Sequence, residues 1–60
     1  MKNGIRINRT LNMIEYLWNR YPDQRLGQLL DNFAFTEDIF FQEDEVTELN
    51  LWRELKWKDN

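Results

Sequence analysis

The sequence predicts an all-α protein, a compact three-helix domain with an irregular, partly extended connection between the second and third helices. Apolar residues recur every three or four positions over about 5–20, 24–34 and 43–57, which is the repeat of one helix face. A single Pro separates the first two stretches, and the residues between the last two show no such repeat. Sixty residues fit one domain, so we take 1–60 as a single small helical unit.

The first predicted helix, about 5–20, has an apolar stripe and a clear stop signal. Pro22 lacks a backbone N–H and disfavours helical backbone at Tyr21, so the helix should end near Arg20. Met13 and Tyr16 lie beside the stripe, where they either cover the edge of the core or belong to a partner surface. The stripe consists of Ile7, Leu11, Ile14, Leu17, Trp18 and Tyr21.

The stretch from Tyr21 to Leu30 turns the chain and starts the second helix. Asp23 is the expected N-cap, because its carboxylate can accept the unpaired backbone N–H groups of the first turn. Gly27 costs stability inside a helix, so we expect it to let another element approach closely. The buried face of this helix should consist of Leu26, Leu29, Leu30 and Phe33.

The connection over 34–42 lacks a helical stripe and contains adjacent aromatic residues. In an extended chain, neighbouring side chains point to opposite sides, so Phe40 and Phe41 cannot both face one core. One of them, together with Phe35 and Ile39, should fill the gap between the helices. The other should be exposed.

The third predicted helix, about 43–57, begins with acids and ends with bases, the arrangement that the helix dipole favours. Leu51 and Trp57 are expected at the margins of its apolar face. The face itself should consist of Val46, Leu49, Trp52 and Leu55.

The composition excludes several kinds of chemistry. The chain has no Cys and no His, which excludes disulfides, zinc-finger sites and His-dependent catalysis. It has no Gly-rich phosphate loop, and so short a chain leaves little room for a substrate pocket, so we expect neither an enzyme nor a cofactor. No run approaches the ~20 apolar residues that span a bilayer, and the basic start is not followed by an apolar run. We therefore expect a cytoplasmic protein.

Aromatic residues are abundant for this length, with three Trp, two Tyr and four Phe. They supply large buried areas to a small core, but one small core cannot hide all of them. The surplus should lie on the surface and favour a homodimer or a protein partner, because Trp and Tyr are enriched at interface centres.

Charge is strongly segregated along the chain. No Lys or Arg occurs between Leu26 and Trp52, and both ends of the chain are mildly basic. Acids concentrate in this middle segment, at Asp31, Glu37, Asp38, Glu43, Asp44, Glu45 and Glu48. Such a face disfavours nucleic acid and favours a basic protein surface.

Three interpretations of the acidic segment stay open. It can be a solvated helix start that is balanced across the fold by basic residues, namely Arg6, Arg9, Arg20 or Arg25. It can be a docking patch in which carboxylates flank an exposed aromatic side chain. A metal site is the weakest interpretation, because the consecutive Glu43, Asp44 and Glu45 cannot all point at one ion. We expect no metal.

The segments YPDQRLGQLLDN and DIFFQEDEV, after an N-terminal RI and an amphipathic helix, resemble a family of short uncharacterised phage, prophage and bacterial proteins. The resemblance covers roughly Arg6 to Leu49 and is most specific in the PD-x-RLGQLL segment and in the aromatic-acidic segment after it. The C-terminal LWRELKW lies beyond the pattern. The resemblance implies a bacterial cytoplasmic setting and a small helical fold without an assigned reaction.

The sequence thus favours a small acidic protein-binding module, a phage-type inhibitor or modulator that occupies a basic surface of a host protein. One alternative is a DNA mimic that inhibits a nucleic-acid enzyme. The other is a helix-turn-helix DNA-binding protein that uses the arginines of the basic N-terminal helix. The predicted partner-binding residues are Phe41, Glu43, Asp44, Glu48 and Trp52.

Overall fold

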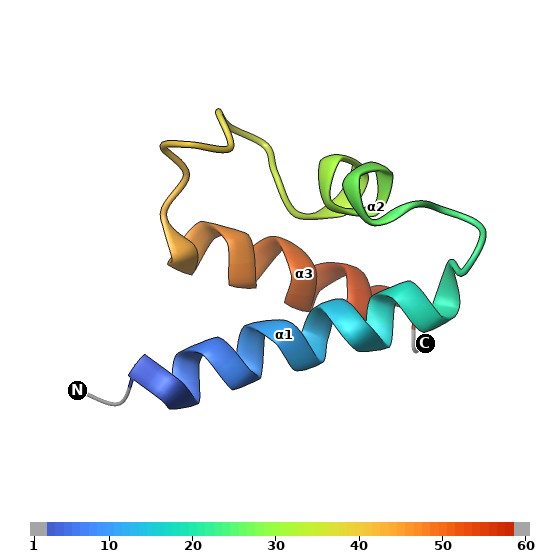
Figure 1. Ribbon diagram of the computed structural model, residues 1–60, viewed down its shortest axis with the longest axis horizontal. Helices are drawn as coiled ribbons and strands as arrows, with labels where there is room; N and C mark the ends of the chain where they lie inside the picture. Colours follow the sequence, from blue (N-terminus) through green and yellow to red (C-terminus); the bar gives the residue numbers. More distant parts are fainter. Residues whose placement is uncertain (1–2, 59–60) are drawn as a thin grey trace.

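Figure 1 shows the computed structural model of the chain, which describes residues 3–58 and the side chains of 4–56. It confirms the predicted all-α, three-helix class. The helices are α1 (Asn3–Arg20), α2 (Leu26–Phe33) and α3 (Asp44–Lys58). Within residues 3–58 there is no strand, so the connection before α3 is irregular and forms no sheet.

The two long helices, α1 and α3, lie side by side and run in the same direction (Figure 1). Side-chain contacts join the two helices at both ends. Near their N-terminal ends Arg9 forms an ion pair with Glu48, and near their C-terminal ends Arg20 donates a hydrogen bond to the carbonyl oxygen of Leu55 at 3.1 Å. The short α2 sits over the C-terminal half of this pair (Figure 1).

The start of α2 differs from the prediction, because Asp23 is not its N-cap. Residues 22–24 form a turn in which the N–H of Gln24 donates to the carbonyl oxygen of Tyr21 at 3.1 Å. The helix therefore starts at Leu26 with Arg25 as its N-cap. The N–H of Arg25 donates to the side-chain oxygen of Gln28 at 2.9 Å, which satisfies one of the otherwise unpaired donors of this helix end.

The core lies where the three helices and the residue after α2 meet. Four side chains in it are fully buried: Leu17, Leu29, Ala34 and Leu51. Partly buried apolar side chains pack around them, namely Met13, Ile14, Tyr21, Leu30, Phe33, Phe35 and Leu55. Met13 thus covers the edge of the core, as one of the two interpretations held, whereas Tyr16 is mostly exposed.

The predicted buried face of α3 was only partly right, because Leu55 packs against the core but the rest of the inner face differs. Leu51 is fully buried rather than marginal, and Leu49 and Trp52 are half exposed. A step of three residues falls short of a full turn by roughly 60°, so positions 46 and 55 lie roughly 180° apart and cannot share one face. The true inner face has a spacing of three and four and includes polar residues, Thr47 and Asn50 beside Leu51.

The apolar stripe of α1 is only partly used by the core. Leu17 is fully buried, but Ile7, Leu11 and Trp18 are exposed, as is Leu26 at the start of α2. For Ile7 the reason is that α2 is only eight residues long and does not reach over the N-terminal half of α1 (Figure 1). The predicted surplus of apolar side chains on the surface is therefore present.

The prediction for Gly27 was also wrong. Apart from its chain neighbours and the backbone of its own helix, a Cβ built on this residue would have no atom within 4 Å, so no other element approaches it closely. Among the described helices, none has the length and apolar character that crossing a bilayer requires.

Candidate functional site

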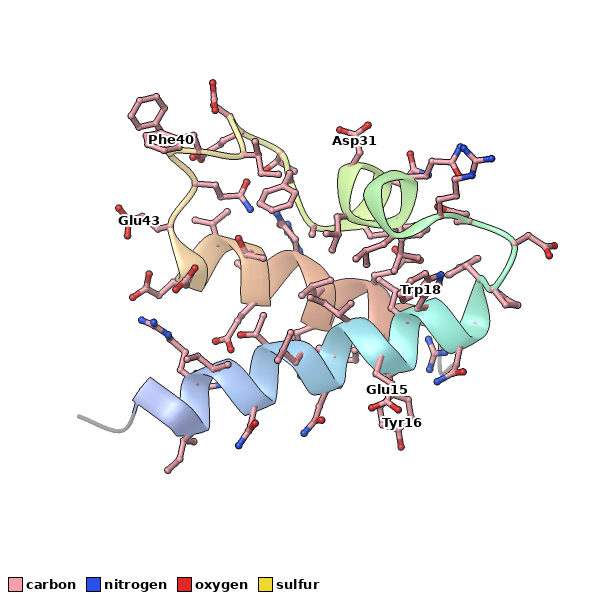
Figure 2. The ribbon with its side chains drawn as sticks, in the orientation of Figure 1. Glu15, Tyr16, Trp18, Asp31, Phe40 and Glu43 are labelled. Carbon is pink, nitrogen blue, oxygen red and sulfur yellow. The ribbon has the colours of Figure 1, made fainter. Side chains whose placement is uncertain are left out.

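The most exposed aromatic side chains lie in the loop between α2 and α3. Phe40 and Phe41 are 82% and 73% exposed, and Ile39 beside them is also exposed. The two rings contact each other edge to face, with centroids 4.9 Å apart. Figure 2 shows Phe40 at the outer end of the loop, away from the helices. We call residues Ile39, Phe40 and Phe41 the aromatic tip.

The aromatic tip corrects the prediction that one Phe and Ile39 fill the gap between the helices. Of the apolar residues proposed for that gap, Phe35 alone packs against the core. The remaining space is filled by the polar side chain of Gln42, which is only 8% exposed. Ala34 brings its backbone carbonyl group to the same place.

The side chain of Gln42 holds the loop against α3 through four hydrogen bonds. Its side-chain NH₂ donates to the carbonyl oxygen of Ala34 and to the hydroxyl oxygen of Thr47, both at 2.7 Å. Its side-chain oxygen accepts from the N–H groups of Thr36 and Glu37 at 3.0 and 3.1 Å. Every hydrogen-bonding site of a neutral amide is thus used, as burial requires.

Asn50 extends this network along α3. Its side-chain NH₂ donates to the same carbonyl oxygen of Ala34 at 2.9 Å, and its oxygen accepts from Arg53 at 3.1 Å. No buried side-chain nitrogen or oxygen among the described residues lacks a hydrogen-bond partner. We call Ala34, Gln42, Thr47 and Asn50 the polar clasp; sequence reasoning missed it, because polar residues within a helix usually face solvent.

Asp38 fixes the backbone of the aromatic tip by accepting hydrogen bonds from its N–H groups. One carboxylate oxygen of Asp38 accepts from the N–H of Phe40 at 2.9 Å. Its carbonyl oxygen accepts from the N–H groups of Phe41 and Gln42 at 3.0 and 2.9 Å. The exposed rings therefore project from a turn whose backbone hydrogen bonds are made within the loop.

Glu48, one of the predicted contact residues, is bound within the fold. Its two carboxylate oxygens accept from Arg9 at 2.9 Å each, and Thr10 donates to one of them at 2.7 Å. The hydrogen bonds from Arg9 and Thr10 lower the pKa of Glu48, and the hydrogen bond with Glu48 raises the pKa of Arg9. The Glu48 side chain is 17% exposed, so little of it remains for a partner.

Asp44 and Glu43 are more accessible. Asp44 forms a longer ion pair with Arg6, at 3.5 Å, between side chains that are both largely exposed. Glu43 is exposed, makes no ion pair among the described residues, and points away from the helices beside the start of α3 (Figure 2). The interpretation that arginines of α1 balance the acidic segment therefore holds for Asp44 and Glu48 but not for Glu43.

Trp52 lies farther along α3, apart from the aromatic tip. It is half exposed, and the Nζ atom of Lys56 lies 5.3 Å from the centre of its ring, a cation–π distance. Trp52 lines a shallow groove of about 350 Å³ between α1 and α3. The predicted set is thus divided: Phe41 and Glu43 lie at the loop end, Asp44 and Glu48 between α1 and α3, and Trp52 beyond them.

The basic residues that a DNA-binding protein would use are mostly engaged within the fold. Arg6 and Arg9 pair with acids of α3, and Arg20 donates to the backbone carbonyl oxygen of Leu55 near the C-terminal end of α3. Arg25 is exposed at the start of α2. Among the described residues, no group of three or more acidic side chains could hold a metal ion.

No family model, curated protein or solved structure matches this chain.

Proposed function

We propose that the chain is a protein-binding module whose contact surface is the aromatic tip and its acidic surround. One observation carries the proposal: two adjacent Phe rings are 82% and 73% exposed on a loop that is hydrogen-bonded into a fixed shape. Removing exposed rings from water lowers the free energy of a complex, and a fixed loop loses little conformational entropy on binding.

The charge around the aromatic tip indicates the kind of partner. Glu37, Asp38 and Glu43 are exposed next to it, and no Lys or Arg lies between Leu26 and Trp52. Carboxylates at the rim of an interface speed the encounter with a basic surface, while the buried centre supplies affinity. A partner with an apolar pocket inside a basic surface fits both features. We extend the proposal to a phage-type inhibitor or modulator of a host protein, in keeping with the family resemblance.

The two nucleic-acid alternatives have less support. A helix-turn-helix reader needs basic side chains that project from the surface, whereas Arg6 and Arg9 neutralise acids of α3. A DNA mimic needs a run of unpaired carboxylates, whereas Asp44 and Glu48 are both paired. The surrounding charges therefore favour a protein partner.

The test is affinity capture from bacterial lysate with the whole chain, followed by binding measurements with each purified partner. The double variant Phe40→Ala/Phe41→Ala should lose at least tenfold in affinity, because it removes both rings. The control is Tyr16→Ala, which removes a ring that is 69% exposed and points away from α3 on another face (Figure 2). Equal affinity of the tip variant and the native chain, with the native fold confirmed by circular dichroism, would overturn the proposal.

A further inference from the structure

A second surface, on α1, is apolar: Ile7, Leu11 and Trp18 are exposed, and Ile14 among them is partly buried against the core. Ile7, Leu11, Ile14 and Trp18 recur at spacings of four, three and four, which is the repeat of a helix seam that packs against another helix. The α3 helix contacts a different face of α1, the one that carries Arg6 and Arg9. We call these four residues the α1 seam.

The α1 seam continues into a groove beside α2. Leu11, Ile14 and Trp18 line a groove of about 760 Å³ together with Leu26 and Leu30 of α2. Trp18 is held in place there, because its indole N–H donates to the carbonyl oxygen of Gln24 at 2.8 Å. Ile7, nearer the N-terminus of α1, is not among the residues that line the groove, and it is half exposed.

We infer that a second copy of this chain docks on the α1 seam, with the two α1 helices antiparallel about a two-fold axis near Asn12 and Met13. In this register Ile7 lies opposite Trp18 of the second copy, and Leu11 opposite Ile14. The seam is thus complementary to itself, as an interface between identical chains requires. This inference does not rest on the aromatic tip.

The position of α2 selects the antiparallel arrangement. In each copy α2 stands over the C-terminal half of α1 and leaves the half with Ile7 open (Figure 1). An antiparallel partner brings its own α2, with the exposed Leu26, towards that open half. In a parallel pair both α2 helices would crowd one end, and at the other end the two Ile7 side chains would cover only each other. Antiparallel helix dipoles also attract each other.

The charge of this face favours a second copy over a charged partner. Glu15 is the one acidic residue among those that line the groove, and no Lys or Arg lines it. In the antiparallel register Glu15 lies near Asn8 of the second copy, whose side-chain NH₂ can donate to the carboxylate. Like charges therefore do not meet across the seam.

The size of the surface predicts a weak dimer. From Ile7 to Trp18 the α1 seam is roughly 17 Å long at 1.5 Å per residue, and α2 widens it at one end. A standard interface covers about 800 Å² on each partner, and the whole chain exposes 4953 Å². The α1 seam, roughly 17 Å of one helix about 10 Å wide with α2 at its edge, is smaller than that, so dissociation constants in the micromolar range are expected.

Sedimentation equilibrium across about 10 to 500 µM, which brackets micromolar association, should show a monomer–dimer equilibrium. Leu11→Lys should raise the dissociation constant at least tenfold, because it puts two charges into an apolar seam. Leu49→Lys is the matched control, since Leu49 is similarly half exposed but lies on α3. A monomer at every concentration, or a dimer that Leu11→Lys leaves unchanged, contradicts the inference.

Disulfide trapping tests the register, because the chain has no cysteine of its own. Equal amounts of Ile7→Cys and Trp18→Cys chains are mixed and oxidised mildly, after circular dichroism has confirmed that both are helical. The expected product is the mixed dimer. Self-linked Ile7→Cys dimers as the main product indicate a parallel pair and overturn the antiparallel arrangement. The Phe40→Ala/Phe41→Ala variant should dimerise as the native chain does, which separates this inference from the proposed function.

Discussion

Arg9 of α1 and Glu48 of α3 form a two-point ion pair, with both N–O distances at 2.9 Å. Thr10 adds a hydrogen bond from the same helix at 2.7 Å. Planar guanidinium and carboxylate groups in this geometry fix direction as well as distance. The pair therefore sets the register of two parallel helices that share only a small apolar core.

This pair predicts a pH dependence of stability. The pKa of Glu48 is lowered in the folded chain by its hydrogen bonds with Arg9 and Thr10. Its stabilisation is complete above the ordinary Glu pKa of about 4.3 and is lost as the pH falls through the lower folded value. Urea unfolding at pH 7 and at about pH 3 should show Glu48→Gln less stable than the native chain at pH 7, with the gap closing in acid. Glu45→Gln, exposed and outside the ion pairs, is the control; an unchanged gap at both pH values contradicts the prediction.

The polar clasp should be essential to the fold. Gln42→Ala leaves the N–H groups of Thr36 and Glu37 without their acceptor and opens a space in a buried site. We expect a loss of about 2–4 kcal/mol in the free energy of unfolding, measured by urea denaturation. The neighbouring change Glu43→Ala, at an exposed position, should alter it by less than about 0.5 kcal/mol. Similar losses for the two variants would argue against the clasp.

The orientation of α3 can be tested with two leucines two positions apart. Leu51 is fully buried and Leu49 is half exposed. Leu51→Ala should lower the free energy of unfolding by about 2–5 kcal/mol, a large share of the stability of so small a domain, whereas Leu49→Ala should cost well under half as much. Thermal and chemical denaturation of both variants measure the difference. If the larger loss occurred at position 49, the face inferred from the sequence pattern would be the right one.

Gly27 offers a stabilising substitution. It lies inside α2, and a Cβ there would meet no atom of another element within 4 Å. Gly27→Ala should therefore raise the free energy of unfolding by about 0.5–1 kcal/mol, because alanine restricts the unfolded chain and favours helix. A rise in the melting temperature checks this, and a fall would mean that the position needs glycine for a contact that this fold does not contain.

The sequence predicted the class of fold well, because Pro22 and the apolar repeats carry strong local signals. The helices begin and end within about two residues of the predicted bounds. It failed for the face of α3, where polar Asn50 and Thr47 point inwards. Their burial depends on hydrogen bonds to Ala34 and Gln42, which lie on another segment, and no local pattern encodes such a pairing.

The candidate site was predictable only in outline. One interpretation was a docking patch in which carboxylates flank an exposed Phe41 or Trp52, and Phe41 and Glu43 are both exposed at the loop end. The prediction placed one of Phe40 and Phe41 inside and did not foresee that both are exposed, because periodicity alone gives no reason for two adjacent rings to leave a small core. The engagement of Glu48 depends on the parallel register of α1 and α3, which is a tertiary property.

Because Gln42 and Asp38 supply the hydrogen bonds that shape the loop, the three side chains of the aromatic tip contribute little to holding the fold together. One set of residues therefore determines the shape of the loop, and another set provides the side chains that it exposes. Such a division allows positions 39–41 to be exchanged for other triplets while the scaffold persists, much as antibody frameworks present interchangeable loops. A library randomised at these three positions could yield small binders to unrelated targets from a chain of 60 residues.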